Sequence, residues 1–322
     1  MSEDSKAEPL NTLIRKIRQP ATLRELMASC LRSIYMGDPF SSSGAKSDLP
    51  EIPSQLIERV IVTEETIAGV RCAIYTPKDS SKVLPVLFYM HGGGFVIGSS
   101  EDTDYTTRNL CHSNQMLVVS INYRLAPETV FPGAVDDCEN VLKNVIADHK
   151  QFKIDSNSVY LAGDSAGANL ALSLLTRLGN ARTSIKGLIL FAPWLDMAVE
   201  NYESYNRLAP TGIVFDAAFL GFARAAYVGF ENWKNPEVSP ILLDFTDLPP
   251  AIVIVGSDDP LVDQTLSLKQ KALDSDCSHL QFEFYEGMPH CFYSFPSLFK
   301  EEEDCFKRVS LFINETNYLS AP

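Results

Sequence analysis

The chain has 322 residues, of which 45% are hydrophobic and 21% are charged, as in a typical globular protein. This length suits one large α/β domain with a small appendage. The formal net charge is −14, from 41 acidic and 27 basic residues, and it argues against nucleic acid or an anionic membrane as a partner.

Three further features of the sequence predict a cytoplasmic protein. The first residues of the chain are polar and acidic, unlike a secretory signal. The longest apolar runs have the length of a strand and fall well short of the roughly 18 residues that a membrane span needs. Seven cysteines are scattered along the chain without a Cys-x-x-Cys pair, which favours reduced thiols.

Residues 1–50 are predicted to form a helical segment ahead of the main domain. Between Leu10 and Ile34, apolar residues recur every three to four positions, which indicates two amphipathic helices. A loop rich in glycine and serine, 37–44, ends them. Because helices that precede the first strand must pack on something, we expect them to cap the sheet.

Predicted strands alternate with predicted helices over most of the remaining chain. The expected strands are 58–63, 70–75, 83–90, 116–121, a run ending at 162, 187–192, 251–255 and 280–285. The expected helices are 103–114, 132–147, a helix that begins after Ser165, 263–274 and 299–314. This alternation predicts an α/β fold with an open, mostly parallel sheet and helices on both faces.

The segment 197–235 interrupts this alternation, because it is aromatic and helical where a simple crossover should stand. We interpret it as a second cap insertion, which leaves 51–196 and 236–322 as the main domain. Its aromatic residues between 215 and 233 admit two interpretations of equal weight. They form either the wall of a confined apolar binding site or simply the buried face of the cap.

Ser165 lies at the centre of a Gly-x-Ser-x-Gly sequence, between a predicted buried strand and a predicted helix. A serine on such a tight turn holds its hydroxyl clear of the fold, and the unpaired N–H groups and the dipole of the helix face it. The alternative is an ordinary capping serine at a helix N-terminus. The strand before and the helix after favour a nucleophile.

A nucleophilic serine needs a base, and five histidines are available at positions 91, 112, 149, 279 and 290. His290 follows the predicted strand 280–285 and a short turn, so it can reach the edge of the sheet where Ser165 lies. His279 precedes that strand and should lie at the opposite end. We therefore predict His290 as the base, with a histidine that caps the next helix as the alternative.

The base needs an acid to orient it, and this acid is expected directly after the strand 251–255. Asp258 and Asp259 both stand there and are hard to separate from the sequence. Pro260 restricts the residue before it to an extended conformation, which suits a fixed acceptor and favours Asp259. Asp263 is expected to begin the next helix, where the dipole stabilises an acid.

Hydrogen-bond donors for a developing oxyanion are expected from two places. Gly92, Gly93 and Gly94 can turn their N–H groups into the site because no side chain blocks them. The amide of Ala166, just after the nucleophile, supplies another donor. A triple glycine alone is weak evidence, since flexible loops share it, but this one directly follows a buried strand.

Seven motifs occur in an order that resembles the hormone-sensitive-lipase-like family of α/β-hydrolases, close to bacterial acetyl esterases. They are His91–Phe95, Asn122–Glu128, Gly163–Gly167, Asn235–Pro240, Leu248–Ala251, Asp259–Leu261 and Pro289–Phe292, within about residues 55–315. The resemblance implies a triad of Ser165, Asp259 and His290. It also implies an oxyanion hole formed by Gly93, Gly94 and Ala166.

The same resemblance makes His91 and Asp164 supporting residues of their motifs, and it implies an α/β-hydrolase fold with a helical cap built from 1–50 and 197–235. Ala168, Asn122 and Cys291 depart from the residues that are usual in the family. Cys291 adds bulk and a thiol beside the base. We interpret it as a tolerated small residue, with crowding of the acyl pocket or sensitivity to thiol reagents as the alternatives.

The sequence therefore predicts a serine carboxylesterase that cleaves esters with short acyl chains through an acyl-enzyme intermediate. No cofactor is expected, and no metal, because the chain has no His-Glu-x-x-His and no clustered ligands. The expected partner is a small-molecule ester, and a homodimer is one option for the assembly. The alternatives are a non-catalytic small-molecule receptor on the same scaffold and an amidase or peptidase.

Overall fold

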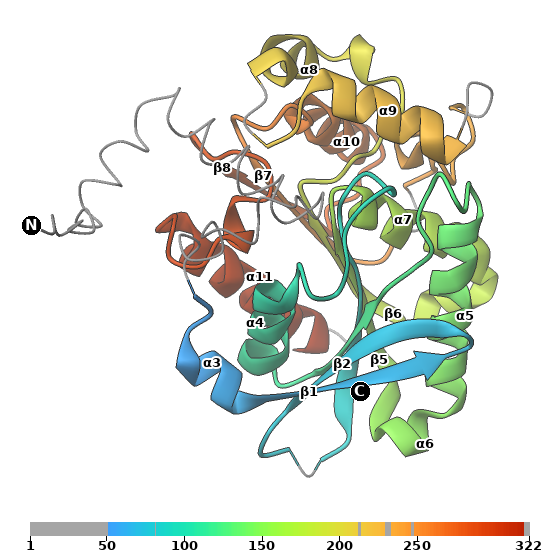
Figure 1. The fold of residues 1–322 in the computed structure, drawn as a ribbon, viewed down its shortest axis with the longest axis vertical. Coiled ribbons are helices and arrows are strands. Elements are labelled where there is room, and N and C mark those ends of the chain that lie inside the picture. Colours follow the sequence, from blue (N-terminus) through green and yellow to red (C-terminus); the bar gives the residue numbers. More distant parts are fainter. Residues whose placement is uncertain (1–50, 81, 212–213, 229–232, 246–247, 319–322) are drawn as a thin grey trace, which may run out of the picture.

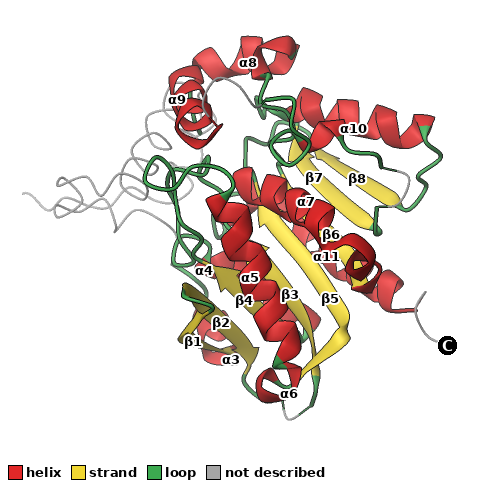
Figure 2. Ribbon diagram, turned by 90° about the vertical axis from the view of Figure 1, so that its right-hand side faces the viewer, coloured by secondary structure: helices red, strands yellow, loops and turns green. Residues whose placement is uncertain are grey.

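The structure is a computed structural model that describes residues 51–80, 82–211, 214–228, 233–245 and 248–318. The helices expected between Leu10 and Ile34 lie outside the described residues. Within the described part, eight strands form one sheet in the order β1-β2-β4-β3-β5-β6-β7-β8. Figures 1 and 2 show this twisted sheet with helices packed on both sides.

The sheet is mostly parallel, as the sequence predicts. β1 (Val60–Ile67) and β2 (Val70–Pro77) form an antiparallel hairpin, and β2 pairs antiparallel with β4 (Leu117–Ile121). The remaining strands are parallel to β4 and are β3 (Leu84–Met90), β5 (Ile154–Asp164), β6 (Ile185–Phe191), β7 (Ala251–Gly256) and β8 (Leu280–Tyr285). The inner strands are almost continuously apolar because both of their faces are covered.

Two hydrophobic cores lie on opposite faces of the sheet, because successive side chains of a strand point to opposite sides. On β3, Phe88 packs into one core and Tyr89 into the other. The first core is covered by α5 (Gly133–Ala147), α7 (Ala166–Leu178) and α10 (Val262–Asp274). The second is covered by α4 (Asp104–Asn114) and α11 (Glu301–Tyr318). In Figure 2, α5 and α7 lie in front of the central strands.

The boundaries differ from the sequence prediction in a few places. The strand expected at 58–63 begins only at Val60, because the short helix α3 (Ser54–Arg59) occupies the residues before it. Another short helix, α6 (His149–Phe152), precedes β5 and was not predicted. The last helix runs on beyond the predicted end at 314 to Tyr318. No helix of the described residues is long and apolar enough to cross a membrane.

The segment interpreted as a second cap insertion contains the short 3-10 helices η4 (Val199–Asn201) and η5 (Ala209–Thr211) and two α-helices, α8 (Glu203–Leu208) and α9 (Ala217–Val228). Figure 1 shows α8 and α9 together at one end of the molecule, above α7 and α10 in that view. Arg224 of α9 donates to both carboxylate oxygens of Glu200 and to the Met197 carbonyl. These bonds tie α9 to the chain that leaves β6.

Candidate active site

Ser165 stands between β5 and α7 in a strained backbone conformation, with φ of 54° and ψ of −116°. Positive φ is rare for a residue other than glycine, and this ψ lies outside the left-handed helical region. The strain persists because the backbone is held on both sides. Its N–H donates to the Phe191 carbonyl at 2.9 Å, and its carbonyl accepts from the Trp194 N–H at 3.1 Å. The Ser165 side chain makes no capping hydrogen bond to α7. The alternative drawn from the sequence, a capping serine, is therefore excluded.

The two glycines of the Ser165 turn are required by close backbone contacts. A Cβ on Gly163 would stand 2.7 Å from the Met90 carbonyl oxygen, and one on Gly167 would stand 1.9 Å from the same atom. Either distance is shorter than real Cβ contacts allow. The end of β3, which leads into the triple glycine, is therefore pressed against the turn that carries Ser165.

His290 and Asp259 are buried together, with 4% and 0% of their surfaces exposed. His290 Nδ1 lies 2.7 Å from Asp259 Oδ2, and the other carboxylate oxygen accepts the Leu261 N–H at 2.8 Å. Because Nδ1 faces a carboxylate, it carries a proton and Nε2 is the nitrogen with a free lone pair. The loops that follow β7 and β8 lie close together, since a Cβ on Gly256 would stand 1.9 Å from the Met288 carbonyl oxygen.

Burial by itself lowers the pKa of His290, but the negative charge of Asp259 and its hydrogen bond outweigh burial and raise the pKa well above 6.5. Asp259 thus stabilises the imidazolium form of the ring. An arrangement of this kind allows the ring to accept a proton from a neighbouring hydroxyl group.

Asp259, which the sequence favoured, and its neighbour Asp258 differ sharply in the structure. Asp258 is exposed and its carboxylate accepts only a 3.3 Å bond from Ser257 among the contacts of the described residues, whereas Asp259 is fully buried against His290. His279 lies at the amino end of β7, where its carbonyl accepts the Ala251 N–H, so it is at the opposite end of the sheet as expected.

The triple glycine forms a tight turn directly after β3. Gly93 has φ of 103° and Gly94 has φ of 63°, and the Gly93 carbonyl accepts the N–H groups of Val96 and Ile97. A Cβ on Gly93 would stand 2.2 Å from the Ile97 carbonyl oxygen. Only glycine fits this path, and the turn begins against the residue before Ser165, since a Cβ on Gly92 would stand 2.2 Å from Asp164 Oδ2.

His91 supports this turn and stays neutral. Its ring stacks on Tyr123 at a centroid distance of 4.2 Å, and Nδ1 lies 2.7 Å from the Gly92 carbonyl oxygen. Burial lowers the pKa of His91 to about 4. Ala166, the other expected donor, is the first residue of α7 and is completely buried. The oxyanion roles of Gly92, Gly93, Gly94 and Ala166 stay predictions.

Residues of the segment 197–235, the predicted second cap insertion, contact both His290 and the glycine turn. The ring of Phe215 lies edge-to-face with the imidazole of His290, with centroids 4.8 Å apart. A Cβ on Gly94 would stand 2.9 Å from Ala223 Cβ and 3.2 Å from the ring of Phe219, so α9 rests on the glycine turn. The sequence signalled only that this segment is aromatic. It did not show which rings face the site, and Phe222 in fact is 57% exposed.

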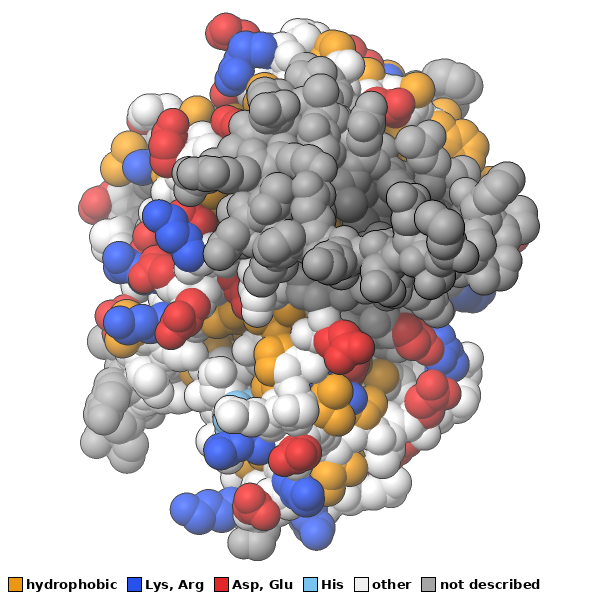
Figure 3. Space-filling model, turned by 60° about the vertical axis from the view of Figure 1, so that its left-hand side comes forward, with side chains coloured by type: hydrophobic (Ala, Val, Ile, Leu, Met, Phe, Trp, Pro, Cys, Tyr) orange, Lys and Arg blue, Asp and Glu red, His pale blue; other side chains and the backbone are white. Residues whose placement is uncertain are grey.

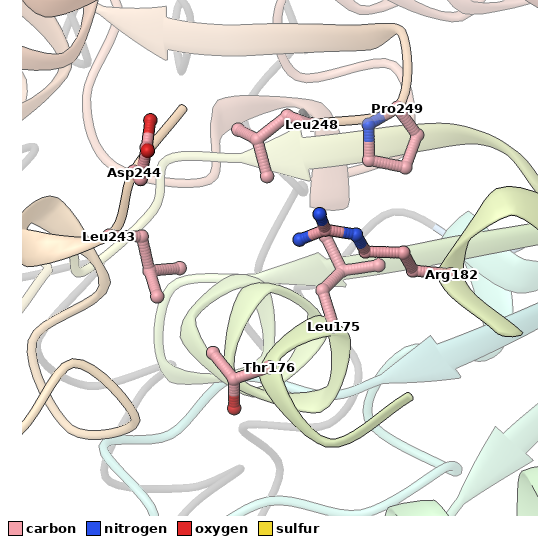
Figure 4. A pocket seen from close by; sticks show the side chains of 7 residues that line it. All are labelled: Leu175, Thr176, Arg182, Leu243, Asp244, Leu248 and Pro249. Atoms are coloured by element: carbon pink, nitrogen blue, oxygen red, sulfur yellow. The ribbon is translucent and has the colours of Figure 1, made fainter. Parts of the chain in front are cut away.

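A separate small hollow of about 30 Å³ lies near the amino ends of β6 and β7, away from Ser165. The residues that line it are Leu175, Thr176, Arg182, Leu243, Asp244, Leu248 and Pro249 (Figure 4). None of the expected site residues is among them. No cluster of histidine, cysteine and acidic side chains suited to a metal ion occurs within the residues that the structure describes.

The described surface does not concentrate one kind of charge on the face drawn in Figure 3, where acidic and basic side chains are interspersed.

Comparison with known proteins agrees with this geometry. Residues 87–294 match a family model described as alpha/beta hydrolase fold. An esterase of Acinetobacter venetianus is 30% identical over 248 residues, which are 76% of this chain and 79% of that protein. An acetyl-hydrolase of Streptomyces hygroscopicus is 30% identical over 70% of this chain and 74% of its own length.

A solved structure of an esterase from Pyrobaculum calidifontis resembles the whole molecule. It is 26% identical in sequence, covers 97% of this chain and 99% of its own, and superposes with a TM-score of 0.75. The similarity therefore extends over the sheet and the helices and is not confined to the motifs.

Proposed function

The chain belongs to the hormone-sensitive-lipase-like family of α/β-hydrolases, and from this premise we propose that it is a serine carboxylesterase acting on esters with short acyl chains. Two of its relatives are an esterase and an acetyl-hydrolase, which supports the reaction and the short acyl chain. The observation that carries the proposal is the buried, hydrogen-bonded pair of His290 and Asp259, whose loop reaches the segment of Ser165 through the contact of Cys291 with Asp164.

In the first half of the reaction, Ser165 Oγ attacks the ester carbonyl carbon while His290 Nε2 removes the hydroxyl proton. Asp259 keeps the proton on Nδ1 and stabilises the imidazolium that forms. The carbonyl oxygen becomes an oxyanion, and the N–H groups of Gly93, Gly94 and Ala166 stabilise it. When the tetrahedral intermediate collapses, the imidazolium gives its proton to the departing alcohol, which leaves an acyl group on Ser165.

In the second half, a water molecule replaces the alcohol. His290 removes a proton from this water, the resulting hydroxide attacks the acyl carbon, and the same oxyanion donors act again. Collapse of this intermediate returns the proton to Ser165 Oγ and releases the carboxylic acid. The balance is one ester and one water converted to one acid and one alcohol, without any cofactor.

The cap assigned to 1–50 and 197–235 belongs to the proposal as the cover of this site. A cytoplasmic location is also part of it, supported by the free cysteines of the described chain, which form no disulfide there. A homodimer stays a prediction for the assembly.

The test is the Ser165→Ala variant, assayed with p-nitrophenyl acetate and p-nitrophenyl butyrate. We expect kcat to fall on the order of 10⁶-fold, as in other serine hydrolases that lose the nucleophile. Ser158→Ala, which changes a buried serine in the amino-terminal half of β5, should keep its activity. Wild-type turnover by Ser165→Ala would end the proposal.

Two further measurements separate the alternatives. A fluorophosphonate probe should label the wild-type chain at Ser165, and the absence of labelling would favour a receptor without catalysis. The amidase alternative is tested with p-nitroacetanilide, whose hydrolysis should be far slower than that of p-nitrophenyl acetate.

A further inference from the structure

The carboxylate of Asp164, the residue before the nucleophile, is buried beneath the proposed site with 7% of its surface exposed. One of its oxygens, Oδ1, accepts the hydroxyl of Tyr89 at 2.7 Å. Tyr89 belongs to β3 and is itself completely buried. The carboxylate is thus bound to the strand that leads into the glycine turn.

The second oxygen, Oδ2, faces two other segments. A Cβ on Gly92 would stand 2.2 Å from it, so the Gly92 backbone lies directly against the carboxylate. The thiol of Cys291 points toward the same oxygen at 3.9 Å, the length of a weak sulfur hydrogen bond. The Asp164 carboxylate therefore contacts both the glycine turn and the loop that carries His290.

These contacts reach the three segments that carry Ser165, the oxyanion glycines and His290. Asp164 is covalently next to Ser165, Gly92 is next to Gly93, and Cys291 is next to His290. Turnover depends on holding such groups within about half an ångström of their productive positions. A single buried acceptor with three bound neighbours is suited to do this.

Cys291 gives the histidine loop a contact that glycine or alanine could not make. Its backbone is left-handed, with φ of 52° and ψ of 34°, and its carbonyl accepts the Ser294 N–H at 3.0 Å. A residue other than glycine is strained in this conformation, so the surrounding structure must hold it. The thiol contact with Asp164 is one of the interactions available for that purpose.

We propose that Asp164 is a positioning residue, which aligns Ser165, the oxyanion glycines and His290 through its contacts with Tyr89, Gly92 and Cys291. The inference rests on the proposed esterase function and adds to it a residue that never touches the substrate. In this chain, the thiol of Cys291 connects the loop of His290 to Asp164.

Electrostatics agrees with this role. Burial raises the pKa of Asp164 to about 6, while the Tyr89 hydroxyl, the charge of His290 and the Gly92 backbone act in the opposite direction. Above that pH the carboxylate is ionised and accepts from its neighbours. Its charge also favours the imidazolium that His290 forms during proton transfer.

The first experiment compares Asp164→Asn and Tyr89→Phe with the wild type on p-nitrophenyl acetate. The amide keeps the shape of the carboxylate but loses its charge and one acceptor. We expect kcat to fall about 10- to 100-fold with KM changed less than about 3-fold, because substrate contacts are untouched. The kcat of Tyr89→Phe should fall less, since this change removes only the hydrogen bond to Asp164 Oδ1.

The second experiment changes Cys291, the residue after His290, and therefore does not depend on how well Asp164→Asn folds. Cys291→Ala should lower kcat by about 3- to 10-fold, and Cys291→Ser, which restores a donor, should recover most of it. Cys138→Ala is the matched control, because this buried cysteine lies on α5 away from the site and should leave kcat unchanged. Circular dichroism and titration with a fluorophosphonate give the folded, reactive fraction in each case.

The outcomes are distinct. Equal kcat values for wild type, Asp164→Asn and Tyr89→Phe would overturn the positioning role, as would equal losses in Cys291→Ala and Cys291→Ser. Losses of kcat that vanish after correction for the reactive fraction would also overturn it. A wild-type chain without ester turnover would overturn the esterase proposal together with this inference, whereas an active wild type with unaffected variants would overturn only the inference.

Discussion

The rim of the sheet and the helix α9 of the proposed cap meet at the same site but are held in different ways. At the rim, Asp259 and His290 are buried and bonded to each other, and the glycine turn leaves no room for a side chain. The helix α9 is held by buried apolar side chains, such as Tyr227 stacked on Phe95, and by the ion pair of Arg224 with Glu200, whose carboxylate side chain is half-exposed. Buried polar contacts fix geometry, whereas apolar packing is non-directional and surface pairs contribute little to stability. We therefore expect substitutions in the rim to lower turnover and substitutions in the cap to change substrate choice.

The largest expected effect is that of Asp259→Asn, which should lower kcat by about 10⁴-fold, because the amide no longer holds the proton on Nδ1 of His290. The neighbouring exposed Asp258 provides a matched control, since Asp258→Asn should lower kcat less than about 2-fold by the same reasoning. Steady-state kinetics on p-nitrophenyl acetate measures both. Equal losses in the two variants would contradict the assignment of the buried carboxylate.

The next effect concerns the contact between rim and cap. Gly94→Ala should lower kcat about 10²- to 10³-fold, because the new Cβ would collide with Ala223 and the positive φ disfavours alanine, so the oxyanion donor moves. Gly221→Ala on α9 is the control, since nothing lies within 4 Å of its Cβ. Adding Ala223→Gly to Gly94→Ala should recover part of the loss. A harmless Gly94→Ala would show that the cap does not press on the glycine turn.

A smaller effect is expected from the cap itself. Phe215→Ala should lower kcat/KM for phenyl acetate by about 10-fold and for methyl acetate much less, because the ring beside His290 provides apolar surface for the departing alcohol. Phe222→Ala changes an exposed ring of α9 and should alter neither. If kcat/KM falls equally for both substrates in Phe215→Ala, the ring affects the catalytic residues of the rim and does not select the substrate.

The smallest effect is a displacement of the pH profile. His290 must be neutral to accept a proton, and Asp259 raises its pKa well above 6.5, so kcat/KM should rise with pH through and above neutrality. In Asp259→Asn the favourable charge is gone, the pKa of His290 falls, and the rise should move to lower pH. The residual activity of that variant, followed from pH 5 to 9, measures the displacement. A rise at unchanged pH would show that another group controls it.

The order of strands and helices and the loops of the site were predictable from the sequence, because they depend on local signals. A run of apolar residues with a glycine at or just after its end marks the ends of β3, β5 and β7. Parallel strands bring their carboxyl ends to the same edge of the sheet. The sequence could therefore predict that Ser165 and His290 belong to loops at the same edge. It also favoured Asp259 over Asp258, through Pro260 and the family motif, but only the structure shows that Asp259 is buried against His290 and Asp258 is exposed.

What only the tertiary structure decided is which side chains touch across distant segments. The contact of Cys291 with Asp164, the bond of Tyr89 to the same carboxylate and the ring of Phe215 against His290 leave no mark in the local pattern. The physical reason is that hydrophobic periodicity reports which face of an element is buried, whereas the partner on that face depends on how separate elements pack against one another.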